Sequence, residues 1–94
     1  MPAELLLHER VILDVAAFVE LVIWRVPKPL EGSRHPYKYR LAYIVDRECV
    51  VRYDNEAGKG DHCHRQGRQE PYRFTSPERL LADFWREVDQ EAES

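Results

Sequence analysis

Three stretches of alternating apolar and polar residues, joined by connections without a helical pattern, most strongly limit the folds open to this chain. They span residues 17–26, 37–45 and 48–53. In the first stretch Val19, Leu21 and Ile23 fall on one side, the period of two of a strand with one buried face. Parallel strands would need a crossover of a dozen or more residues, usually helical. The pattern therefore predicts an antiparallel sheet, with Asp46 and Arg47 turning one hairpin.

Weaker signals extend this sheet on both sides. Residues 4–13 are apolar enough for a strand or a bent hairpin, and residues 71–74 suit a short edge strand. The stretch 27–36 is expected to be a loop, because its prolines cannot donate to a sheet ladder. The glycine-bearing stretch 55–67 is expected to be a second loop.

A helix is expected at the C-terminal end. Ser76 can cap it, Pro77 suits the first helical position, and Glu78 favours the positive end of the helix dipole. Apolar residues then follow at helical spacing: Leu80, Leu81, Phe84, Trp85 and Val88. We interpret this stripe as core. The predicted fold class is α+β, an antiparallel β-sheet of four to five strands with one C-terminal helix packed on it.

Length and composition narrow the class of protein. The chain has 94 residues, and we expect a single domain over residues 1–94. Cys49 and Cys63 form no CxxC pair and suit two free thiols, with Cys49 buried in mid-strand. Charged residues interrupt the N-terminal apolar residues, and no apolar run approaches the ~20 residues that cross a bilayer. We therefore expect a cytoplasmic protein with no membrane segment and no cofactor.

Charge is unevenly distributed along the chain, whose net charge is −3. The C-terminal end is acidic, with an acidic tail from about residue 89. Residues 59–73, in contrast, carry four bases, two acids and two histidines. This stretch suits an anionic ligand, although a solvated loop without a function has the same composition.

The residues best suited to chemistry lie between Arg52 and Arg68. Glycines on both sides of Lys59 could curl backbone amides around an anion, although no P-loop pattern is present. His62 and His64 would project to the same face of an extended strand and could act as acid and base. RNA cleavage through its own 2′-hydroxyl needs such a pair and a cation, and Asp61 could orient one ring. The candidate catalytic residues are Lys59, Asp61, His62, His64 and Arg65.

Other interpretations of the same residues stay open. Histidines in a loop are most often exposed and without a function. Asp61, His62, Cys63 and His64 could bind zinc, but Cys63 would point away from both histidines in an extended strand. A structural zinc site normally takes four ligands, so we expect no metal site. Large aromatic residues are interpreted as core or half-buried sheet residues rather than platforms for bases: Trp24, Tyr39, Tyr43 and Trp85.

Four longer segments carry an ordered pattern. They are FVELVIWRVP at residues 18–27, KYRLAYIVD at 38–46, RYDNEAGKGDH at 52–62 and EPYRFTS at 70–76. With them the chain resembles, from about residue 4 to about residue 88, the TumE family of toxins from bacterial toxin–antitoxin systems. The resemblance implies a small toxin encoded with an antitoxin, usually a helix-turn-helix protein. It also implies a functional centre at the KGDHxH element, with ribonuclease action as an extension.

Carried over by position, the resemblance implicates Tyr53, Asp54, Asn55, Gly58, Lys59, Gly60, Asp61, His62 and His64. The expected substrate-binding residues are Arg52, Tyr53, Asp54, Asn55, Gly58, Gly60 and Arg68. The chain departs from the family pattern at Cys63, where a basic residue is expected, and at residues 14–16, where Asp-Gly is usual. We predict a toxin that is a metal-independent endoribonuclease acting on RNA. The alternatives are a non-enzymatic toxin that binds a protein target and a degenerate toxin that retains only antitoxin binding.

Overall fold

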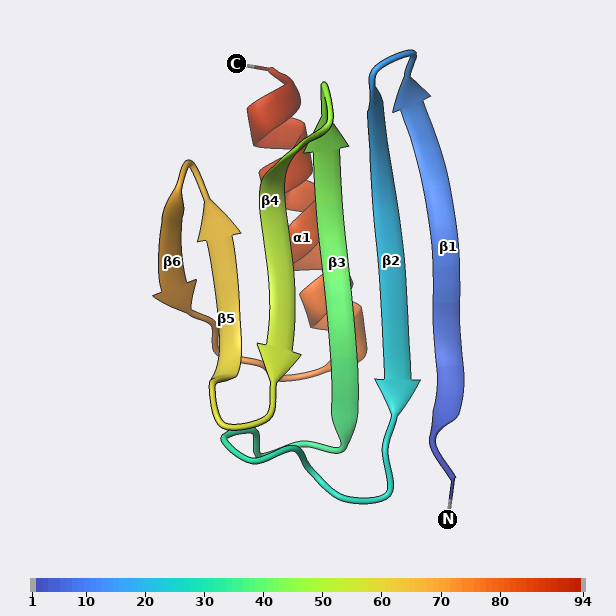
Figure 1. Ribbon diagram of the computed structural model, residues 1–94, viewed down its shortest axis with the longest axis vertical. Helices are drawn as coiled ribbons and strands as arrows, with labels where there is room; N and C mark the ends of the chain where they lie inside the picture. Colours follow the sequence, from blue (N-terminus) through green and yellow to red (C-terminus); the bar gives the residue numbers. More distant parts are fainter. Residues whose placement is uncertain (1, 94) are drawn as a thin grey trace.

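The computed structural model describes residues 2–93, which form a six-stranded antiparallel sheet and one helix (Figure 1). The strands are β1 (Glu4–Asp14), β2 (Ala17–Arg25), β3 (Tyr37–Val45), β4 (Glu48–Glu56), β5 (Gly60–Arg65) and β6 (Arg68–Pro71), and the helix is α1 (Pro77–Ala92). Neighbours in the chain are neighbours in the sheet, from β1 at one edge to β6 at the other. The α+β class is therefore confirmed, but the strand count is six rather than four to five.

The additional strand comes from the stretch expected to be a loop at 55–67. β4 continues to Glu56 and turns through only three residues into β5. Gly58 and Gly60 have φ angles of 85° and 74°, a left-handed conformation that glycine adopts without strain. The short turn that follows, at Gln66 and Gly67, leads into β6. The edge strand is therefore Arg68–Pro71 rather than residues 71–74, and residues 4–14 form one strand rather than a bent hairpin.

A bulge in β4 overturns the expectation for Cys49. Tyr43 of β3 pairs with Val51, but the next residue, Ile44, pairs with Cys49, which leaves Val50 as an extra residue. An extra residue shifts the alternation of side chains by one. Cys49 is consequently exposed rather than buried in the core.

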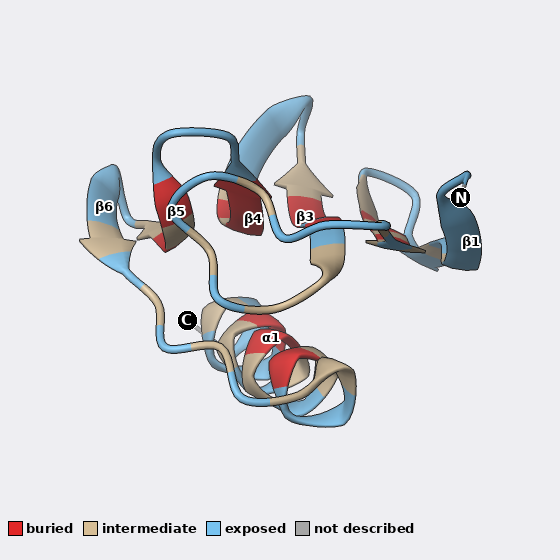
Figure 2. Cartoon of the chain, turned by 90° about the horizontal axis from the view of Figure 1, so that it is seen from below, coloured by how far each residue is buried: buried red, intermediate tan, exposed pale blue. Residues whose placement is uncertain are grey.

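The core lies between the sheet and α1, which covers one face of the sheet (Figure 2). We call this face the helix-side face. Its buried residues are Val19, Leu21, Ile23, Tyr39, Leu41, Tyr43, Val51, Tyr53 and Cys63, packed with Leu80, Phe84 and Val88 of α1. The opposite surface, which carries Val22, Arg40, Asp54 and His62, is called the open face. Within residues 2–93 no helix covers the open face, because α1 is the only helix there.

The cap predicted for α1 is confirmed. The side-chain oxygen of Ser76 accepts a hydrogen bond from the backbone N–H of Arg79 at 3.0 Å. The acidic tail expected from about residue 89 belongs to α1 as far as Ala92, while Ser94 lies outside the described residues. The described helix is too short and too polar to cross a membrane.

Replacing the Ser76 cap by alanine is expected to lower the free energy of unfolding by about 1 kcal/mol, because one backbone N–H of the first turn loses its acceptor. Urea unfolding followed by circular dichroism measures the change. The matched control is Thr75→Ala, one residue earlier and exposed. Equal stability of the two variants would contradict this role for Ser76.

Candidate functional site

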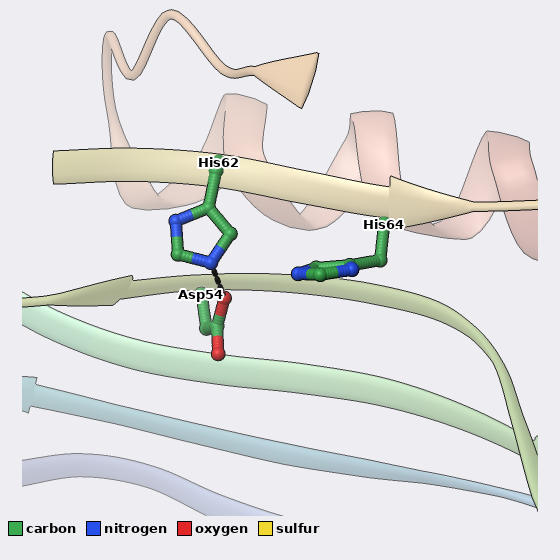
Figure 3. A group of neighbouring side chains, drawn as sticks. All are labelled: Asp54, His62 and His64. Carbon is green, nitrogen blue, oxygen red and sulfur yellow. Dashed lines mark ion pairs between the residues drawn. The ribbon is translucent and has the colours of Figure 1, made fainter. Parts of the chain in front are cut away.

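Four polar side chains meet on the open face, across the pairing of β4 with β5. Asp54 lies directly opposite His62, and Arg52 lies directly opposite His64. Residues that oppose each other in an antiparallel pair point to the same face, so these four side chains gather there. Figure 3 shows both imidazole rings reaching from β5 toward Asp54 on β4. The prediction that His62 and His64 share one face is confirmed, and their ring centroids are 5.3 Å apart.

His62 is buried and lies between two oxygen atoms. Its Nδ1 is 3.2 Å from the carbonyl oxygen of Gly60, and its Nε2 is 2.7 Å from Oδ1 of Asp54. The second contact is close but poorly aligned, because Oδ1 of Asp54 is a buried atom without a hydrogen bond within residues 2–93. Both ring nitrogens of His62 therefore face oxygen atoms that accept protons.

His64 faces a cation instead of oxygen atoms. Its Nε2 lies 2.8 Å from Nη2 of Arg52, and a guanidinium can only donate, so Nε2 accepts this hydrogen bond. Desolvation, followed by the positive charges of Arg52 and His62, lowers the pKa of His64 below its usual 6.5. His64 is thus neutral near pH 7, with its lone pair directed at Arg52. A ligand anion that drew Arg52 away would free this lone pair to accept a proton.

Arg52 links the cluster. Its Nε lies 3.3 Å from Oδ2 of Asp54, but it is a buried atom that makes no hydrogen bond within residues 2–93. The side chain of Arg52 as a whole is 29% exposed, and a guanidinium is always charged and can only donate. Arg52 is therefore the group of this cluster best placed to contact an anion.

The same cluster has a composition that could hold a metal ion. One ligand atom each from Asp54, His62 and His64 lies within 4.8 Å of the others. Two imidazoles and a carboxylate are a donor set that suits zinc and other transition metals. The guanidinium of Arg52 already contacts His64 and Asp54, so a metal would have to displace it. The alternative zinc ligand set, with Asp61 and Cys63, differs from this one, because Cys63 is buried on the helix-side face.

Asp61 does not contact the histidine pair. Its carboxylate accepts hydrogen bonds from Ser33 Oγ at 2.7 Å and from the hydroxyl of Tyr39 at 2.7 Å. Oδ2 of Asp61 also lies 2.6 Å from Nε2 of His35. Ser33 and His35 belong to the loop between β2 and β3, and Tyr39 belongs to β3 itself. Burial and Asp61 raise the pKa of Tyr39, which keeps its hydroxyl protonated and donating.

Asn55 supports the same loop from the neighbouring strand. Its Oδ1 accepts from the backbone N–H of Tyr39 at 2.9 Å, and its Nδ2 donates to the carbonyl of Tyr37 at 2.8 Å. The Gly58 N–H donates to the carbonyl of Glu31 at 2.7 Å. Together with Asp61, these contacts fasten the loop at 26–36 to the β4–β5 turn. Asn55 and Gly58 therefore help to hold this loop in place.

The remaining expected residues lie away from the pair. Arg65, on the helix-side face, forms ion pairs with Glu70 and with Glu87 of α1, and the Glu70 bond is the first cause of its raised pKa. Three others have separate positions: Tyr53 packs in the core, Arg68 is exposed opposite Arg65 on β6, and Lys59 is exposed in the β4–β5 turn. Gly60 contacts Gly32 so closely that a side chain at either position would clash.

Sequence reasoning passed over two contacts that the fold creates. The spacing of His35 in the loop at 27–36 allows but does not require it to approach the site, yet it pairs with Asp61 and stacks on Phe74 with ring centroids 3.7 Å apart. Asp54 was expected to bind substrate, yet it is the carboxylate beside His62. Only the pairing register of β4 with β5 identifies this partner, because the two residues are not at a recognisable spacing in the sequence.

Comparisons with known proteins bear on the identity of the chain. No curated protein and no solved structure matches it. The model of one protein family, described as Toxin TumE, matches residues 2–92, which is nearly the whole chain. This agrees with the resemblance of the four sequence segments and implies an antitoxin as partner. The chain belongs to the TumE family, the toxins of toxin–antitoxin systems.

Proposed function

We propose that this toxin is an endoribonuclease that cleaves RNA without a metal ion, using the histidine pair on the open face. The main support for the proposal is that the two imidazole rings have different partners. His64 is a neutral acceptor beside Arg52, and His62 is held as a donor between Asp54 and Gly60. A neutral base and a protonated acid 5.3 Å apart, next to a cation, are what cleavage by the 2′-hydroxyl needs.

The proposed reaction is an internal transfer at one phosphate. Nε2 of His64 takes the proton of the 2′-hydroxyl, and the 2′-oxygen forms a bond to phosphorus. The bond from phosphorus to the 5′-oxygen breaks, and His62 gives its proton to that oxygen. Arg52 contacts the charged phosphate oxygens and leaves the lone pair of His64 free. The products are a 2′,3′-cyclic phosphate and a 5′-hydroxyl end.

This assignment redistributes the expected catalytic roles. His62 and His64 keep the roles of acid and base, while Arg52 supplies the cation and Asp54 orients His62. Lys59, Asp61 and Arg65 have no part in the proposed step, since Asp61 and Arg65 are engaged on the helix-side face. Lys59 lies 3.5 Å from Glu56 in the turn and remains available to more distant phosphates.

The test is incubation of the purified, antitoxin-free toxin with end-labelled RNA in excess EDTA. We expect cleavage with 2′,3′-cyclic phosphate ends, and none by the His62→Ala/His64→Ala variant, whose fold is checked by circular dichroism. No cleavage by the folded wild type would overturn the proposal and favour a toxin that acts by binding.

A metal-dependent nuclease is the second candidate, favoured by the proximity of Asp54, His62 and His64. It predicts that EDTA abolishes cleavage and that added Zn²⁺ or Mn²⁺ restores it. The two candidates also differ at Arg52. Replacing Arg52 by a neutral residue should slow the metal-free reaction. The same replacement should strengthen metal binding, because the guanidinium no longer occupies Asp54 and His64.

The acidic limb of the pH–rate profile is expected below pH 6.5, because the lowered pKa of His64 delays its protonation as the pH falls. Arg52→Gln removes one of the charges that lower this pKa, so its acidic limb should move to higher pH. Asp54 and Glu56 act in the opposite direction. The measurement is kcat/KM against pH for both proteins. If the acidic limb of the Arg52→Gln profile stays in place or moves to lower pH, His64 is not the base.

The antitoxin is proposed to be a helix-turn-helix protein, as the family resemblance implies. The end of α1 offers a surface for a basic partner, because its last turn carries acids and no basic residue. Acids at this end are unfavourable for the helix dipole, and a basic partner would offset that. Unchanged antitoxin affinity after Asp89→Asn/Glu91→Gln would exclude this contact.

A further inference from the structure

A depression lies on the open face directly beside the histidine pair. Its volume is about 440 Å³, and it shares Arg52 and Asp54 with the cluster described above. Trp24, Lys38 and Arg40 also line it. The depression therefore connects the proposed cleavage centre to an aromatic residue and two further cations.

Strand register gives the spacing of these groups. Arg40 of β3 opposes Asp54, and Lys38, two residues earlier on the same strand, opposes Trp24 of β2. All of them belong to the open face. Strands lie about 4.8 Å apart and two residues along a strand span about 6.7 Å, so Trp24 lies roughly 12 Å from Asp54 and roughly 16 Å from His62 on β5, measured along the backbone of the sheet. A short single strand with one base at Trp24 and a phosphate at the histidine pair can span this separation.

The charge of the depression suits a polyanion. Lys38 and Arg40 are exposed, and neither forms an ion pair within residues 2–93. The acids nearby are already engaged, since Asp54 pairs with His62 and Glu56 with Lys59. Arg52 adds a third guanidinium or ammonium group, although it is already engaged with Asp54 and His64. The free charge in the depression is therefore positive.

We infer that this depression is a subsite for single-stranded RNA, in which Trp24 stacks on an unpaired base near the cleaved bond and Lys38 and Arg40 hold the phosphate between them. Aromatic rings beside a cationic track are the usual platform for unpaired bases, because every base offers a flat face. The inference deepens the proposed function and rests on it for the cleavage step. It names the substrate class as single-stranded RNA with little dependence on base identity.

The test uses single-stranded poly-deoxyadenylate, which lacks the 2′-hydroxyl and so binds without being cleaved by the proposed route. The chain has two tryptophans, so a Trp85→Phe background leaves Trp24 as the only indole. We expect its fluorescence to be quenched when the oligonucleotide binds. Trp24→Leu should weaken binding about 5- to 150-fold, the usual loss for one stacked base, and Trp24→Phe should lose less.

The two cations are tested by salt dependence. Lys38→Gln/Arg40→Gln should lower the slope of log affinity against log salt by about 0.7 for each phosphate that the variant no longer neutralises. The matched control is Arg79→Gln/Arg86→Gln on α1, which removes the same charge from exposed positions away from the open face. This control should leave both the affinity and the slope close to those of the parent.

The outcomes separate this inference from the proposed function. Absent quenching, or equal affinity of Trp24→Leu and its folded parent, would overturn the subsite even if RNA is cleaved. Quenching by DNA with no cleavage of RNA would uphold the subsite and overturn the catalysis. If Trp24→Leu fails to fold, the quenching experiment decides alone. A change of Trp24 emission with the antitoxin but not with nucleic acid would overturn the subsite and assign the face to the antitoxin.

Discussion

Replacing His64 by alanine is expected to lower the rate of RNA cleavage by about 10²–10⁴-fold, the usual contribution of a positioned general base. The reason is that Nε2 of His64 is the acceptor of lowered pKa that lies beside Arg52 on the open face. The side chain is only half-buried, so its removal should leave the sheet folded. Single-turnover cleavage of labelled RNA measures the change, with circular dichroism as the check on folding.

The matched control is His8→Ala. His8 is exposed on β1, at the edge of the sheet farthest from β5 and β6. It removes the same chemical group, so its cleavage rate should equal that of the wild type. A His64→Ala rate equal to that of His8→Ala would rule out His64 as the base. Combining His62→Ala with His64→Ala should cost less than the product of the single losses, because both residues serve one step.

The alternation of apolar residues was enough to predict most of the sheet. It gave the helix-side positions of Val19, Leu21 and Ile23, and those of the third and fourth strands up to the bulge at Val50. The bulge itself has no signal in composition, and it exposes Cys49. The stretch at 55–67 was mistaken for a loop because glycines mark both loops and tight turns. Only cross-strand pairing distinguishes the two.

The part of the candidate site that follows from the alternation of side chains along one strand was predictable. His62 and His64 are two apart and share a face, as expected. The same period puts Asp61 on the other face from His62, so it argues against Asp61 as the residue that orients this ring. The true partner, Asp54, depends on register between two strands, and the partner of Asp61, His35, depends on a loop returning to the sheet. Contacts of this long-range kind leave no local pattern.

Asp61 is therefore expected to act on stability rather than on catalysis. Asp61→Ala should lower the free energy of unfolding by about 3–5 kcal/mol, because it leaves polar groups of Ser33, His35 and Tyr39 without their shared acceptor. Its side chain is only 9% exposed, so water replaces it poorly. For a chain of this size such a loss is a large part of the total stability.

Urea unfolding measures this loss, and Glu56→Ala is the matched control. Glu56 lies in the same hairpin, but its side chain is 54% exposed, and its one ion pair within residues 2–93 is with exposed Lys59. Exposed pairs contribute up to about 1 kcal/mol, so the control should change little. At low temperature, where the Asp61→Ala protein remains folded, its cleavage rate should stay within a few-fold of the wild type. Wild-type stability combined with an absence of cleavage would instead make Asp61 part of the catalytic machinery, and the loop would then have to approach the substrate.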